Sequence, residues 1–136
     1  MKKSLVLLIL LLVTAAAPLK AQFTNLIYSQ YAYTELNGDG EWNDWSEWIS
    51  RPGQITKSDT EFNINFKETD FVLTIKYEMD PWADADGFFH RVFMCENDTK
   101  TICRVDVLID FLNVTIPECR VWFGDTAKAF KVESSD

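Results

Sequence analysis

The sequence EFNINFKETDFVLTIKYEM, residues 61–79, carries the clearest structural signal in the chain. From Phe62 to Phe66 large apolar side chains alternate with polar ones, which places them on one face of an extended strand. The same period of two returns in residues 71–79. Residues 67–70 between the two runs are polar and few, so we predict that the runs pair as an antiparallel hairpin.

A second hairpin is expected downstream, because Phe88–Glu96 is rich in aromatic residues, Asn97–Lys100 is a cluster of turn-forming residues, and apolar side chains alternate again from Cys103 to Phe111. We find no amphipathic helix longer than a turn or two. About eight short strands with regular turn signals predict an all-β, single-domain fold, either an antiparallel sandwich or a small up-and-down barrel. The weaker predicted strands cover residues 24–35, 45–50, 120–123 and 128–133.

The N-terminal residues have the pattern of a secretory signal peptide. Two lysines follow Met1, and the apolar run from Leu5 to Val13 is well short of the about 20 residues that a membrane-spanning helix needs. We predict a signal peptide over residues 1–21, cleaved after Ala21, and a single β domain over residues 22–136. The protein is therefore expected to be secreted or periplasmic, and soluble after cleavage.

The chain is acidic. Its 136 residues include 21 Asp and Glu against 13 Lys and Arg, a formal charge of -8. Cleavage would remove three lysines and no acid, leaving 10 basic and 21 acidic residues, or -11. This charge, with no basic stripe, disfavours nucleic acid as a partner and would steer cationic proteins toward the surface.

Three cysteines, Cys95, Cys103 and Cys119, would reach a compartment where disulfides persist. Cys95 and Cys103 flank the turn of the second hairpin, and a loop of three or five residues would place them opposite each other. We predict a disulfide between these two, reachable in a non-hydrogen-bonded strand pair, with a bridge to Cys119 as the alternative. A zinc site that adds His90 is disfavoured, because no two of these residues have the short spacing of a zinc knuckle.

Two weaker sites are considered. Asp80, Asp84 and Asp86 lie close to Gly87, a composition typical of calcium loops, but their spacing does not fit the EF-hand template. An irregular calcium site at these three residues leaves a calcium-dependent module as an alternative function, although a solvated acidic loop is the commoner outcome. His90, the only imidazole, leaves a hydrolase that pairs it with a loop carboxylate as an alternative function. The sequence has neither a Gly-x-Ser-x-Gly motif nor a glycine-rich phosphate loop, and no cofactor is predicted.

Tryptophan recurs at every third position in WNDWSEW, residues 42–48. In an extended strand Trp42 and Trp48 would share one face and Trp45 would point to the other. Exposed indoles beside carboxylates suit stacking on a sugar or an aromatic ligand, or anchoring a protein. We predict binding at Trp42, Trp45, Trp48 and Trp82, lining an open barrel end, with plain packing of the barrel end and rim as the alternative.

The sequence thus favours a non-enzymatic binding domain of one of two kinds. The first holds a small apolar or sugar ligand at the open barrel end. The second docks a cationic protein through its acidic surface and an aromatic anchor. Ionic strength separates them, because electrostatically steered capture weakens steeply with salt and burial of a ligand does not.

Overall fold

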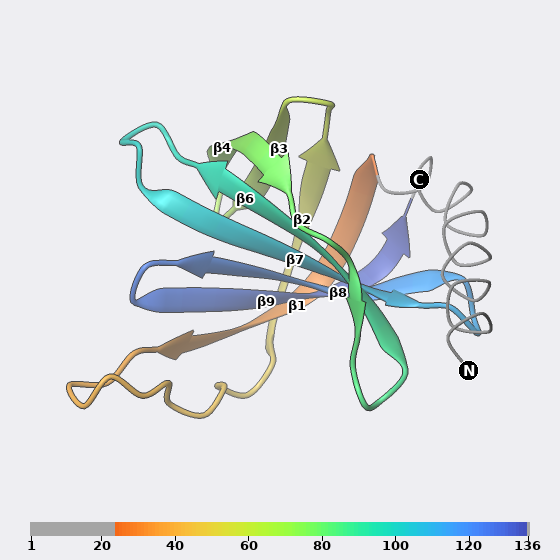
Figure 1. The fold of residues 1–136 in the computed structure, drawn as a ribbon, viewed down its shortest axis with the longest axis horizontal. Coiled ribbons are helices and arrows are strands. Elements are labelled where there is room, and N and C mark those ends of the chain that lie inside the picture. Colours follow the sequence, from red (N-terminus) through yellow and green to blue (C-terminus); the bar gives the residue numbers. More distant parts are fainter. Residues whose placement is uncertain (1–23, 136) are drawn as a thin grey trace.

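Residues 24–135 are described by a computed structural model, in which they form nine strands and no helix (Figure 1). Consecutive strands of the barrel pair antiparallel, β9 returns to β1, and β4 also pairs with β6, so eight strands close on themselves. The fold is therefore an up-and-down barrel rather than a sandwich, with the short β5 added beside β6. The predicted signal peptide, residues 1–21, lies outside the described residues. The strands are β1 (Asn25–Glu35), β2 (Ile49–Lys57), β3 (Glu61–Phe66), β4 (Thr69–Glu78), β5 (Trp82–Ala83), β6 (Phe88–Glu96), β7 (Ile102–Asp110), β8 (Thr115–Phe123) and β9 (Thr126–Ser135).

Both predicted hairpins are confirmed. In the first, Phe62 lies opposite Leu73, and both side chains are buried inside the barrel. In the second, β6 has the predicted bounds and Cys95 lies opposite Cys103. The alternation of apolar side chains therefore builds the barrel interior, as expected for a sheet with one buried face.

The interior is packed closely around Tyr28. This side chain is fully buried, and its hydroxyl donates a hydrogen bond to the backbone carbonyl of Asn65 at 2.5 Å. Its ring lies against Gly53 of β2, where a Cβ atom would come within 2.1 Å of the Tyr28 hydroxyl oxygen. Glycine at position 53 therefore makes room for the tyrosine ring.

The strand predicted over residues 45–50 is wrong for residues 45–48. Strand β2 begins only at Ile49, and the preceding segment 37–48 crosses the outer face of the barrel. It is held there by the backbone N–H of Ser46, which donates to the Tyr33 carbonyl at 2.8 Å, and by the Thr34 hydroxyl, which donates to the carbonyl of Asn43 at 2.6 Å. The outer wall is flat at this point because its side chains are small: Ala32, Ala127 and Ala129 are all buried beneath neighbouring residues.

The predicted disulfide is not present, and all three cysteines are buried free thiols. The predicted register is right, but the type of strand pair is not the one expected. The backbone N–H of Asn97 donates to the Thr101 carbonyl, which makes these two residues a hydrogen-bonded pair. Hydrogen-bonded and non-hydrogen-bonded pairs alternate along an antiparallel ladder. The Cys95–Cys103 pair consequently falls at a hydrogen-bonded position rather than the closer, non-hydrogen-bonded one that the prediction required. Burial raises the pKa of the Cys95 thiol to about 12, which keeps it protonated and unreactive.

Residues 24–135 contain no helix with the length and apolar character that crossing a membrane would require.

Candidate functional site

A cavity of about 480 Å³ lies at the barrel end where the β3–β4, β6–β7 and β8–β9 turns meet. The last two of these turns are seen together at the left of Figure 1. A volume of this size falls within the range of small-ligand sites. Its apolar lining consists of Ile64, Phe66, Phe71, Val72, Leu73, Phe123 and Phe130. We call this cavity the mouth cavity.

Lys128 is the one positively charged residue among the described residues that line the mouth cavity. It lies opposite Val121, which is fully buried inside the barrel, while the flanking Ala127 and Ala129 belong to the outer wall. Its ammonium nitrogen lies 5.5 Å from the ring centroid of Phe66. Among the described residues Lys128 has neither an ion pair nor a hydrogen bond, so a half-buried cation faces the cavity without an anionic partner.

The pKa of Lys128 is lowered, first because burial disfavours the charged form and then because Lys67 adds a second positive charge nearby. Glu35 opposes this shift. The Lys67 ammonium nitrogen lies 5.3 Å from the same Phe66 ring, so two cations meet at one aromatic residue at the cavity edge.

The four tryptophans chosen from the sequence lie elsewhere, and none of them lines the mouth cavity. Trp42 and Trp45 make edge contacts with Trp122 of β8, with ring centroids 5.0 and 5.8 Å apart. The guanidinium of Arg104 lies over the Trp122 ring, and that of Arg120 lies over the Trp45 ring. These indoles therefore cover the outer wall of the barrel. Trp122 was missed because its place in a short apolar run gave no sign that it faces outward.

Trp48 and Trp82 are both partly exposed, and they lie on the same outer wall. Trp48 lines a shallow hollow together with Glu118 and Arg120, which form an ion pair. Trp82 is in β5 and lies directly opposite His90 of β6. The structure thus spreads the four predicted binding residues over one side of the molecule.

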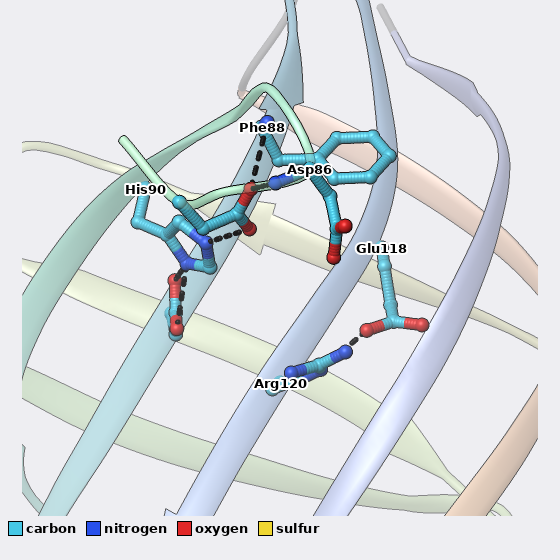
Figure 2. A network of polar contacts seen from close by, with 7 residues as sticks. Asp86, Phe88, His90, Glu118 and Arg120 are labelled. Carbon is cyan, nitrogen blue, oxygen red and sulfur yellow. Dashed lines mark hydrogen bonds and ion pairs between the residues drawn. The ribbon is translucent and has the colours of Figure 1, made fainter. Parts of the chain in front are cut away.

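His90 is buried between two carboxylates on this outer wall (Figure 2). Its Nδ1 atom lies 2.9 Å from Oδ1 of Asp106, and its Nε2 atom lies 2.8 Å from Oδ2 of Asp84. Both ring nitrogens are therefore engaged, and neither is directed at a substrate. The geometry is that of a clamp that fastens the β5–β6 connection to the barrel, and it does not support the hydrolase alternative.

Asp84 also organises its own loop. Its Oδ1 atom accepts hydrogen bonds from the backbone N–H groups of Asp86 at 2.9 Å and Phe88 at 3.0 Å (Figure 2). The pKa of Asp84 is lowered, chiefly because His90 donates to it; partial burial opposes this effect, and the two backbone donors add to it. Both oxygens of the Asp84 carboxylate are thus engaged in hydrogen bonds within the protein.

The weaker metal predictions gain no support. Among residues 24–135, no three His, Cys, Asp or Glu side chains are grouped so that they could hold a metal ion, and this includes Asp80, Asp84 and Asp86. The cysteines lie inside the barrel, whereas His90 lies on its outer wall, so they do not converge on a zinc ion.

No family model matches this chain, and neither curated proteins nor solved structures provide a match.

Proposed function

We propose that the protein is a secreted or periplasmic, non-enzymatic binding protein that holds one small apolar molecule in the mouth cavity. The observation that carries this proposal is the cavity itself, about 480 Å³ and lined by four phenylalanines at the open end of the barrel. An eight-stranded barrel is just wide enough to hold one small ligand.

Two features of the entrance support this function. Phe71 and Val72, which line the cavity, are each 42% exposed, an apolar surface that a ligand would cover. The rings of Phe66 and Phe130 are already fixed by a mutual edge contact with centroids 6.0 Å apart. A ligand would therefore meet a wall that is largely formed in advance, which limits the entropy lost on binding.

The test uses N-phenyl-1-naphthylamine, an uncharged fluorescent probe, titrated into the purified protein. We expect saturable binding of one probe per chain, abolished by Phe71→Asp and retained in Tyr77→Asp. Tyr77 is a matched control because it is on the same strand and 60% exposed, but lies outside the cavity. Equal binding by both variants, or no saturable binding to the wild type, would refute the proposal.

The same titration at low and high salt addresses the acidic surface. Burial of an uncharged probe should be nearly independent of ionic strength. A cationic protein partner remains the alternative, and a search for one would look for binding that weakens steeply with salt.

A further inference from the structure

We propose that the ligand of the mouth cavity carries an anionic head, such as a carboxylate, which pairs with Lys128 while its apolar body lies among the phenylalanines. This inference rests on the proposed function and specifies the chemical class of the molecule bound. It depends on the position of Lys128, whose side chain lies on the inward-facing side of β9, opposite the buried Val121.

The partial burial of Lys128 costs free energy, because no anionic side chain among residues 24–135 pairs with its ammonium. A lysine ammonium that leaves water normally gains a carboxylate partner or a set of acceptors. Lys128 has neither among the described residues, and its ammonium lies over the rings of Phe66 and Phe123, at 5.5 and 5.9 Å from the ring centroids. An anion entering the cavity would supply the missing partner.

Lys67 adds to the positive charge at the cavity edge. Its ammonium lies over the rings of Tyr31 and Phe66, at 5.7 and 5.3 Å from their centroids. Burial and repulsion from Lys67 both lower the pKa of Lys128, and the negative charge of a bound anion would oppose both effects. The two lysines therefore favour an anionic ligand over a neutral one.

Nearby acids do not replace this missing partner. Glu35 faces Lys128 but makes no ion pair with it within the described part of the chain. Asp70 and Asp98 both line the cavity, but neither forms an ion pair with Lys128 among the described residues. Asp70 accepts a hydrogen bond from the side-chain amide of Asn65 at 2.9 Å, and Asp98 is an exposed residue of the β6–β7 turn. The overall charge of -8 acts mainly at a distance, where physiological salt screens it.

The experiment compares 2-naphthoate with 2-naphthalenemethanol by isothermal titration calorimetry at pH 7.4. The two probes share one aromatic body and differ in the charge of the head group. We expect the carboxylate to bind at least about tenfold more tightly, the scale of one charge-assisted hydrogen bond. Lys128→Met should remove this preference, and Lys131→Met should keep it, since Lys131 is exposed on the same strand and points outward.

Three results would overturn the inference: equal affinity of the two probes for the wild type, a preference that survives in Lys128→Met, or failure of 2-naphthoate to bind a protein that still binds N-phenyl-1-naphthylamine. Failure of the uncharged probe itself would instead refute the proposed function. The two ideas can therefore fail separately.

Discussion

The imidazole of His90 lies flat against the indole of Trp82, with ring centroids 3.9 Å apart and planes inclined by 7°. Because Trp82 is 49% exposed and His90 is buried, the indole acts as the cover over the histidine and its carboxylates. The short strand β5 thus has a structural purpose, which is to close this polar cluster from solvent.

Removal of the cover should weaken the fold. We expect Trp82→Ala to lower the free energy of unfolding by about 1–2 kcal/mol, because the stacked contact and the shelter of His90 are lost together. Urea denaturation measures the change. Trp48→Ala is the matched control, since Trp48 has similar exposure and should cost less. An equal loss in both variants would contradict a special role for the stack.

The buried carboxylate of Asp106 should destabilise the fold once His90 is removed. His90→Phe leaves this buried acid without its hydrogen-bonded partner and should cost about 3–5 kcal/mol. The double variant His90→Phe/Asp106→Val should be more stable than His90→Phe alone, because it no longer buries an unpaired Asp106 carboxylate. Urea denaturation of the two single variants and the double variant completes the cycle. Additive losses would show that the two side chains do not depend on each other.

The lowered pKa of Asp84 predicts a particular response to acid. The stabilisation from its charged form is fully present above the ordinary value of 3.8 and is lost as the pH falls through the lowered value of the folded state. The stability gap between wild type and Asp84→Asn should therefore be open at pH 6 and shrink below about pH 4. Urea midpoints from pH 2 to 6 test this expectation. Asp86→Asn is the control for the loss of one loop carboxylate, because only the backbone N–H of Asp86 takes part in the hydrogen bonds of Asp84.

A glycine in the β3–β4 turn should stabilise the protein. Lys67 and Glu68 both have positive φ, 50° and 66°, the conformation of a two-residue type I′ turn that favours Asn-Gly. We expect Glu68→Gly to raise the free energy of unfolding by about 0.5–1 kcal/mol, since the cost of a side chain in this region exceeds the added freedom of the unfolded chain. Glu61→Gly, in the adjoining strand, should instead destabilise the protein in the same denaturation assay.

Gly53 should tolerate no side chain. A Cβ atom there would meet the buried ring of Tyr28, and the hydrogen bond of that residue to Asn65 prevents an easy shift. We expect Gly53→Ala to cost at least about 2 kcal/mol, as overpacked cores do. Gly38→Ala is the control, because nothing lies within 4 Å of its added methyl group. Thermal unfolding of the two variants distinguishes them, and similar melting temperatures would contradict the close packing described here.

The hairpins could be predicted because one face of each strand is buried, so apolar side chains recur at every second residue. Strand β6 was predicted with its exact bounds. Strand β2 was misplaced because Pro52 and Gly53 interrupt its alternation, and the register with β1 shifts nearby. Strand β5 is only two residues long and has no pattern of its own.

The mouth cavity was harder to foresee, because its phenylalanines come from strands that are distant in sequence. One local signal did exist: Lys128 shares its parity with Phe130 and Val132, both of which pack in the barrel core. The outward position of Trp42 and Trp45 also had a signal, in the small side chains of Ala127 and Ala129 on a wall that something larger must cover. Neither pattern shows which residues of other strands lie beside these positions, because that depends on how the strands are arranged in the barrel.

The most direct test of the account is to map the binding site by two-dimensional NMR while N-phenyl-1-naphthylamine is added. We predict saturable shifts of the backbone amides of Phe71, Thr99 and Lys128, which surround the mouth cavity. Shifts confined to Trp45, Trp48 and Arg120 would place the ligand on the outer wall instead and contradict the central claim.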